Sequence, residues 1–111
     1  MNTNFFTPIQ LKKLPAVIGE VAISRTTLYR NIKRGTYTKG VSIGGDRVAW
    51  PDYEIEVINR AKISGFTEAA IKELVTKLHE LREGLKPGLD VAAEVANIFD
   101  ELNSPQKNKT V

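Results

Sequence analysis

The sequence contains no cysteine and only one histidine, His79. Disulfide bonds and thiolate metal ligands are therefore excluded, and one histidine does not form a metal site by itself. No apolar run approaches the length of a membrane span, and residues 1–10 lack the charged-then-apolar order of a signal peptide. These absences predict a cytoplasmic, nucleoid-associated protein that holds no metal and does not contact a membrane.

Motifs that carry enzyme chemistry are absent too. The sequence has no nucleophile placed beside a base and no pair of carboxylates in a motif, and Gly44-Gly45 lacks the lysine and the helix of a phosphate-binding loop. We expect His79, which follows the apolar Leu78, to be a surface side chain without a catalytic role. The sequence therefore predicts a protein that is not an enzyme and that needs neither a cofactor nor a small-molecule ligand.

Aromatic residues are scarce, at 7% of 111 residues, but 41% of the chain is apolar, which suffices for one modest core. The charge is uneven along the chain, because residues 1–65 contain ten Lys or Arg and five Asp or Glu, whereas residues 66–111 contain six and eight. Such a basic half favours a polyanion as partner, although an ordinary solvated face has a similar composition. Between Ser24 and Ala49 only Asp46 opposes the basic residues Arg25, Arg30, Lys33, Arg34, Lys39 and Arg47.

Two short helices are predicted in the basic half. Apolar residues at helical spacing indicate a first helix from Pro15 to about Glu20. Ser24 then offers a capping hydroxyl to a second helix, Arg25–Arg34, which Gly35 ends. At about 100° per residue, the second helix has one polar and basic side. This side, called the basic face below, consists of Arg25, Thr26, Tyr29, Arg30 and Lys33.

Beyond the second helix the pattern changes to two short strands joined by glycines. The strands are predicted at Val41–Ile43 and Arg47–Trp50, with Gly44, Gly45 and Asp46 between them as a hairpin turn. A third helix follows from Pro51 until the Ser64-Gly65 pair ends it. We expect the indole of Trp50 to fill the core, so that its loss unfolds the protein.

Leucines mark the acidic half. Thr67 is the predicted cap of a helix with an apolar stripe, and a second helix is predicted after Asp90, ending near Leu102. We predict that the stripe makes the protein a homodimer; the alternative is that both helices fold onto the rest of the same chain. The stripe, called the leucine seam below, consists of Ile71, Leu74, Leu78, Leu81 and Leu85.

Helix, turn, Ser-capped basic helix, glycine-tipped hairpin and helix is the order of a winged helix-turn-helix. The sequence thus predicts a mostly α protein with a winged helix-turn-helix DNA-binding domain over residues 8–64, whose wing is a two-stranded β-hairpin. A C-terminal helical hairpin over residues 66–102 and a disordered tail over residues 103–111 follow. A helix fits the major groove of duplex DNA with its N-terminal residues nearest the bases.

The sequence resembles the AlpA-like family of phage and prophage regulators, whose DNA-binding unit is related to that of MerR-type regulators and phage excisionases. The resemblance spans about residues 10–83. The family commonly has glycine where this chain has Ala22, and prolines where it has Thr38 and Gly40, so we expect a loose loop before the hairpin. The residues that carry the resemblance include Leu14-Pro15-Ala16-Val17, Ile23-Ser24-Arg25-Thr26-Thr27-Leu28-Tyr29-Arg30, Ile32-Lys33-Arg34-Gly35, Gly44-Gly45, Arg47-Val48-Ala49-Trp50 and Leu74-Val75-Thr76-Lys77-Leu78-His79.

The basic face and the resemblance together predict which side chains contact DNA. Three of them also have a structural interpretation. Ser24 is a helix cap whether or not it contacts DNA. In the alternative interpretation, the Tyr29 ring packs on the neighbouring helix, and Arg47 pairs with Asp46 or Glu54. The predicted DNA-binding residues are Ser24, Arg25, Thr26, Thr27, Tyr29, Arg30, Lys33, Lys39 and Arg47.

The resemblance implies a site-specific double-stranded DNA-binding protein of a phage or mobile element. It would act as a transcriptional regulator, for example of an integrase promoter, or as an excision factor that bends DNA at an attachment site. Two alternatives from other classes stay open. A small terminase-like subunit also couples DNA recognition to assembly and would form a large ring, and a protein-interaction adaptor would use the basic face to bind an acidic partner.

Overall fold

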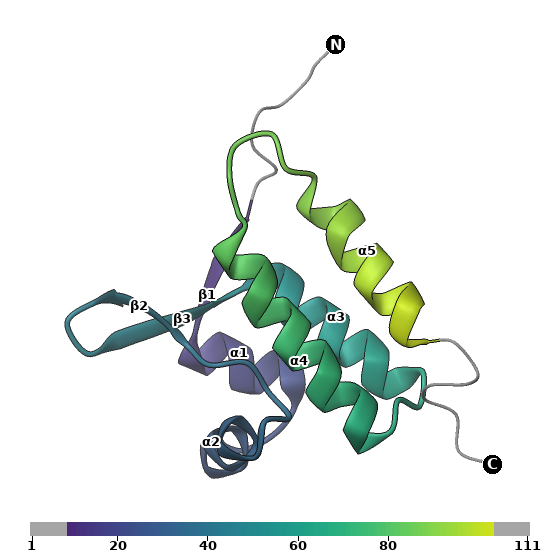
Figure 1. Ribbon diagram of the computed structural model, residues 1–111. Coiled ribbons are helices and arrows are strands. Elements are labelled where there is room, and N and C mark those ends of the chain that lie inside the picture. Colours follow the sequence, from purple (N-terminus) through teal and green to yellow (C-terminus); the bar gives the residue numbers. More distant parts are fainter. Residues whose placement is uncertain (1–8, 104–111) are drawn as a thin grey trace.

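The computed structural model describes residues 9–103, which form five helices and one small antiparallel sheet (Figure 1). Every predicted helix and both predicted strands are present, so the mostly helical fold class is confirmed. Residue 8, where the predicted DNA-binding domain begins, and residues 104–111 of the predicted tail lie outside the described residues. The elements are β1 (Leu11–Lys13), α1 (Leu14–Val21), α2 (Arg25–Arg34), β2 (Val41–Gly44), β3 (Arg47–Pro51), α3 (Asp52–Ile63), α4 (Glu68–Glu83) and α5 (Val91–Leu102).

Capping side chains define where three of the helices begin. Ser24 Oγ accepts a hydrogen bond from the backbone N–H of Thr27 at 3.1 Å, which satisfies one of the free donors in the first turn of α2. Thr67 and Asp90 cap α4 and α5 in the same way. At the other end of α2, Gly35 adopts a φ of 84°, a conformation that glycine tolerates best. The bounds of α2 therefore follow directly from its sequence.

The sheet has three strands where the sequence predicts two. β3 lies in the middle, with β2 on one side and β1 on the other. In the added antiparallel pair, Lys12 lies opposite Trp50, and the backbone N–H of Asp52 donates to Gln10 O at 2.8 Å. β1 is only three residues long, includes two lysines and pairs with a distant segment, so no local pattern reveals it. This strand fastens the N-terminal part of the described chain to the base of the hairpin.

The β2–β3 hairpin agrees with the prediction and projects from the body of the molecule (Figure 1). Its pairing is irregular between Ser42 and Gly44, where a register shift bends the strand. Gly44 and Gly45 adopt φ values of 123° and 58°. Because residues with a β-carbon rarely adopt these angles, the two glycines allow the tight tip of the hairpin.

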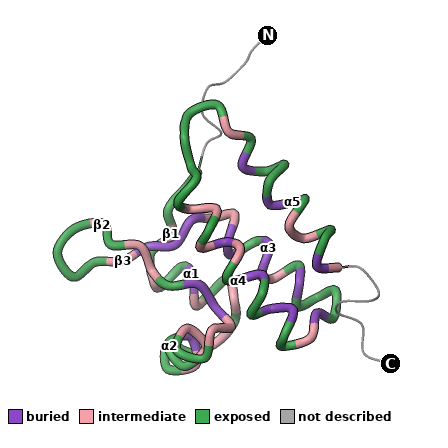
Figure 2. Tube along the Cα trace, viewed as in Figure 1, coloured by how far each residue is buried: buried purple, intermediate pink, exposed green. Residues whose placement is uncertain are grey.

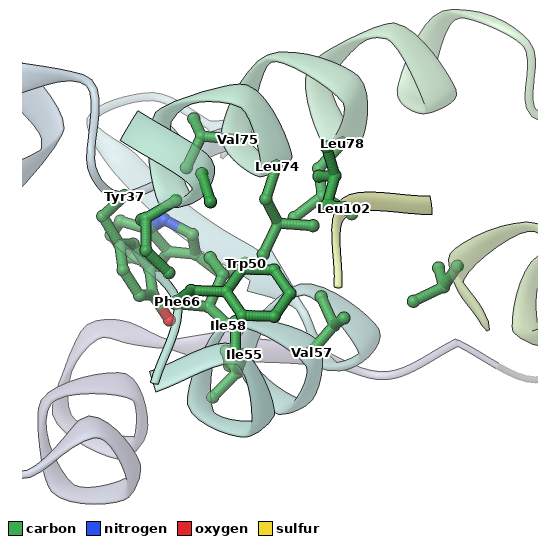
Figure 3. Close-up of a cluster of buried hydrophobic side chains, with 14 of the residues drawn as sticks. Tyr37, Trp50, Ile55, Val57, Ile58, Phe66, Leu74, Val75, Leu78 and Leu102 are labelled. Atoms are coloured by element: carbon green, nitrogen blue, oxygen red, sulfur yellow. The ribbon is translucent and has the colours of Figure 1, made fainter. Parts of the chain in front are cut away.

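One cluster of buried side chains joins all of the helices, and side chains from β3, α3, α4 and α5 converge in it (Figure 3). α3 occupies a central position, in contact with α1, β3, α4 and α5. Trp50 is completely buried, as predicted, and its Nε1–H donates to Thr38 O at 2.8 Å. The basic half and the acidic half of the sequence therefore share one core.

Most of the leucine seam is buried in this core. Ile71, Leu74 and Leu78 are buried within their own chain, because α4 packs on α3 and α5. The rings of Phe66 and Phe99, 5.1 Å apart, further attach α5 to the start of α4. The described residues thus follow the alternative in which both C-terminal helices fold onto the same chain. A dimer contact through the whole seam would require this core to open.

Candidate nucleic-acid interface

The outer side of α2 is exposed, and the hairpin tip is exposed on the same side of the molecule, away from α5 (Figures 1 and 2). α2 is held to the body mainly by the fully buried Leu28, with Ile32 half-buried beside it. Tyr29 is 43% exposed and is not one of the buried core residues. The predicted basic face is therefore a surface, with all five of its side chains, Arg25, Thr26, Tyr29, Arg30 and Lys33, exposed.

The cations of this surface lack acidic partners. Five basic side chains, called the free cations below, form no ion pair within residues 9–103. Four other basic side chains, Lys12, Arg34, Arg60 and Lys72, each pair with a glutamate. Arg34, at the end of α2, lies 3.2 Å from Glu68 of α4. Unpaired, exposed cations favour the approach of an anion over a broad area. The free cations are Arg25, Arg30, Lys33, Lys39 and Arg47.

The hydroxyls of Ser24 and Thr27 are engaged with each other at the start of α2. Ser24 Oγ lies 3.0 Å from Thr27 Oγ1 in addition to capping the Thr27 N–H. Thr27 is half-buried, whereas Ser24 is exposed. Both residues therefore have a structural role, and the first backbone N–H groups of α2 have no acceptor within the helix.

Arg47 begins β3, immediately after the hairpin tip, and its side chain is exposed. Neither of the acidic partners considered from the sequence pairs with it. Asp46 has no ion pair among the described residues, and Glu54 is bound to Arg82 instead. The guanidinium is therefore available at the most protruding part of the hairpin.

The loop that leads into the hairpin is tied at consecutive backbone groups, contrary to the expectation that it is loose. The Lys39 N–H donates to His79 Nε2 at 3.1 Å, and Arg82 Nη2 donates to Lys39 O at 2.6 Å. Trp50 holds the preceding carbonyl, that of Thr38. A β-carbon on Gly40 would lie 2.9 Å from the Val48 β-carbon, so glycine permits this close approach.

His79 is therefore not the surface side chain that the sequence predicts. It is half-buried, and its Nε2 receives the Lys39 N–H. Burial, followed by the positive charge of Arg82, lowers the pKa of His79 below its ordinary value of 6.5, and nearby Lys39 acts in the same direction while Glu54 opposes them. The neutral imidazole favoured by these effects is the form that can accept a hydrogen bond.

Glu54 and Arg82 are the functional neighbours that sequence reasoning missed. Glu54 is fully buried, and both of its carboxylate oxygens accept hydrogen bonds from Arg82 at 2.7 Å. A buried carboxylate requires such a partner, because an uncompensated charge in the core is costly. The periodicity of α3 does place Glu54 beside the apolar Ile55 and Ile58, but nothing local identifies a partner 28 residues later.

A groove of the described chain lies elsewhere. It has a volume of about 1070 Å³ and runs between α3 and α5, where Glu20, Asp52, Glu56 and Asp100 are among its lining residues. Four carboxylates make this groove unsuitable for nucleic-acid phosphates. Within residues 9–103 no group of three or more His, Asp or Glu is placed to hold a metal ion, and no helix there is both long and apolar enough to cross a membrane.

Comparison with known proteins gives the family of the part that contains α1, α2 and the hairpin. Residues 10–57 match the family model described as prophage CP4-57 regulatory protein (AlpA). The chain is also 34% identical over 53 residues to the uncharacterized protein ORF88 of Enterobacteria phage P4, a match that covers 48% of this chain and 60% of the phage protein. No solved structure matches the chain. Residues 10–57 are thus similar to the AlpA family of prophage regulatory proteins, and the chain spans less than two thirds of the length of the phage relative it matches.

Proposed function

We propose that this chain is a site-specific double-stranded DNA-binding protein that regulates transcription in a phage or mobile element, and that it is not an enzyme. In this proposal α1 and α2 are a helix-turn-helix, and the β2–β3 hairpin is its wing. The carrying observation is that the five free cations are exposed on α2, on the hairpin and on the loop between them, without acidic partners among residues 9–103. The regulatory role in the AlpA family description supports the same function.

α2 is the proposed recognition helix. Its apolar side is held to the body by Leu28, so the basic face is free to enter the major groove, whose width admits an α-helix. Arg25, Thr26 and Tyr29 stand nearest the N-terminus and would read base edges. Arg30 and Lys33, one turn further along, would contact either bases or phosphates. Guanine is the favoured base for an arginine or lysine contact, through its O6 and N7 acceptors.

Phosphate contacts would position this helix. The start of α2, with the Ser24 and Thr27 hydroxyls, carries free backbone N–H groups suited to one phosphate. Arg47 at the hairpin would bind the backbone or enter the minor groove, and Lys39 before the hairpin would bind a second phosphate. Such contacts raise affinity for every sequence and make binding sensitive to salt.

The division of labour between the two halves of the chain is also part of the proposal. Residues 8–64 would supply the DNA-binding surface, whereas residues 66–102 would support it. Two copies on two half-sites would read more base pairs than one copy. Since most of the leucine seam is buried within the chain, a contact between copies would have to use surfaces that remain accessible, such as the exposed Leu85 and the half-buried Leu81.

The excision-factor alternative uses the same surface for a different purpose. A regulator recognises a promoter, whereas an excision factor bends DNA at an attachment site so that a recombinase can act. We favour the regulator because the family description names a regulatory protein. In either role the partner is duplex DNA, which places the protein with the nucleoid in the cytoplasm.

Selection of bound duplexes from a random pool, with the full chain, tests the proposal. We expect one enriched motif, and its position in the native genome separates a promoter from an attachment site. Arg30→Ala should bind the enriched motif more weakly, while Lys86→Ala, which removes an exposed lysine between α4 and α5, should bind it like wild type. Failure to enrich any duplex, or binding of acidic polypeptides in place of DNA, would contradict the proposal and favour the adaptor alternative.

A further inference from the structure

The hairpin is tied to α4 through the backbone of a single residue, Lys39. His79 Nε2 receives the Lys39 N–H at 3.1 Å, and Arg82 Nη2 donates to the Lys39 carbonyl at 2.6 Å. β2 begins at Val41, two residues further along. A displacement of the Lys39 backbone is therefore transmitted to the first strand of the hairpin, and with it to Arg47 at the start of the second strand.

The α4 side of this connection is rigid. Arg82 donates two hydrogen bonds of 2.7 Å to Glu54 of α3, whose side chain is completely buried. His79 precedes Arg82 by three residues and therefore lies on the same side of α4. The loop is thus attached to a helix that is itself anchored in the core, so the two hydrogen bonds to Lys39 restrict where the hairpin can lie.

The two hydrogen bonds differ in their response to protons. Arg82 stays charged at every relevant pH and keeps its donors. The hydrogen bond from Lys39 requires neutral Nε2, because in the imidazolium ion both ring nitrogens carry protons and neither accepts. The charged groups that face His79 are Arg82 on α4, Glu54 on α3 and Lys39 on the loop. Protonation would add a third positive charge beside Arg82 and Lys39, where Glu54, the carboxylate that acts on His79 among residues 9–103, is already bound to Arg82.

Both side chains lie outside the segment that matches the AlpA family model, residues 10–57. Lys39, which they hold, lies inside it. The C-terminal helices consequently act on the DNA-binding surface without contributing residues to it. The acidic half of the chain, whose own charge would repel DNA, thus has an indirect role in DNA binding.

We propose that His79 is a positioning residue for the wing, and that loss of its hydrogen bond to the Lys39 backbone, by substitution or by protonation, weakens binding to the specific DNA site. The inference rests on the proposed DNA-binding function. It makes affinity for DNA sensitive to pH below 6.5, the ordinary pKa of histidine. His79 is the single histidine of the chain, so no other imidazole titrates in that range.

The test compares full-length wild type, His79→Gln and His79→Leu. Gln keeps a neutral acceptor at every pH, whereas Leu removes the acceptor and keeps an apolar side chain. Dissociation constants for the selected duplex would be measured from about pH 8 to about pH 4.5 at constant ionic strength. His79→Leu should bind about 3- to 10-fold more weakly than wild type at the upper pH, as expected for one hydrogen bond. His79→Gln should bind nearly as well as wild type there.

The pH profile carries the decisive readout. Because the pKa of His79 is lowered, the imidazole is neutral above its ordinary value and becomes charged only as the pH falls below it. Wild type should therefore lose affinity toward the lower pH, while His79→Gln should show a flatter profile. An unchanged pH profile in His79→Gln, or wild-type affinity of His79→Leu, would overturn the proposal. If His79→Leu is too unstable to assay, the comparison of wild type with His79→Gln decides alone.

A second measurement separates this inference from the proposed function. The Lys39 amide is observable by NMR in the free protein, where its exchange and chemical shift report the hydrogen bond to His79 directly. The chemical shift and the exchange protection, taken relative to the intrinsic exchange rate at each pH, should change in wild type as the pH falls and stay constant in His79→Gln. An Arg30→Ala control should weaken DNA binding at every pH and keep the wild-type profile. Lack of any effect of Arg30→Ala would overturn the function instead, whatever the Lys39 amide shows.

Discussion

α2 and α4 are both amphipathic helices that carry several basic residues, but the structure uses these charges in opposite ways. On α4, Arg82 is bound to the buried Glu54, and Lys72 lies 3.9 Å from Glu68. On α2, only Arg34 has a partner, and that partner belongs to α4. The remaining cations of α2 are exposed and form no ion pair among residues 9–103. Basic residues in a sequence therefore indicate a binding surface only after those with structural partners are set aside.

Removal of Arg82 should have the largest effect. Arg82→Ala leaves the completely buried Glu54 without a partner, which should lower the free energy of unfolding by about 3–5 kcal/mol. Urea or thermal unfolding measures this loss. Lys72→Ala is the matched control on the same helix, because its ion pair is exposed and contributes less than about 1 kcal/mol. Similar losses of unfolding free energy in the two variants would show that Arg82 does not stabilise the buried Glu54.

Removal of Arg30 or Lys33 should affect DNA and leave stability unchanged. Both side chains are exposed on α2 and have no ion pair among residues 9–103. Each alanine variant should lose about 1–3 kcal/mol of binding free energy if its side chain contacts a base edge, with relaxed preference at one base pair. Gel shifts at moderate salt and melting curves measure the two properties. A fall in melting temperature that accounts for the weaker binding would refute the assignment of these residues to the interface.

Arg47→Ala should have a smaller effect, because a hairpin on the DNA backbone mainly positions the recognition helix. We expect affinity to decrease for all sequences together and the slope of log affinity against log salt to decrease by about one unit. Footprinting of the minor groove should also show a narrower protected region than with wild type. A protected region of unchanged width would mean that the hairpin is not the wing.

A substitution in the turn between α1 and α2 should stabilise the protein. Ala22 is the one residue other than glycine with positive φ among residues 9–103, at 63°. Because the β-carbon strains this conformation, Ala22→Gly should raise the free energy of unfolding by roughly 1 kcal/mol. Thermal unfolding tests it, and DNA affinity should stay at the wild-type value. A lower melting temperature would indicate that the turn is held by contacts of the Ala22 methyl group.

Local signals account for most of what the sequence could predict. Ser24, Gly35 and the Gly44-Gly45 pair each act on neighbouring residues, so the bounds of α2 and the hairpin follow from propensity and capping alone. The basic face follows from helical periodicity in the same way. Its exposure agrees with the prediction, while DNA contact by its side chains stays a prediction.

Long-range partners account for what the sequence could not predict. β1 needs Trp50 opposite Lys12, and the role of His79 depends on a backbone group 40 residues earlier. The leucine seam has the same spacing whether it meets a second copy or α3 and α5 of its own chain, so periodicity alone does not choose. The expected looseness before the hairpin was wrong for a related reason. The missing prolines are local, whereas the hydrogen bonds that restrain the loop come from α4.

The single core has a consequence for how this protein comes apart. Since Val17 of α1, Trp50 of β3, Leu78 of α4 and Leu102 of α5 belong to one buried cluster, no helix in it can detach without exposing apolar surface of its neighbours. Unfolding should therefore occur in one cooperative transition, with the most slowly exchanging amides in the central α3. A chain ending near residue 65 would lose α4 and α5, and with them the apolar cover of Trp50 and α3. Degradation beginning at the C-terminal helices would thus abolish the whole fold and shorten the lifetime of the protein in the cell.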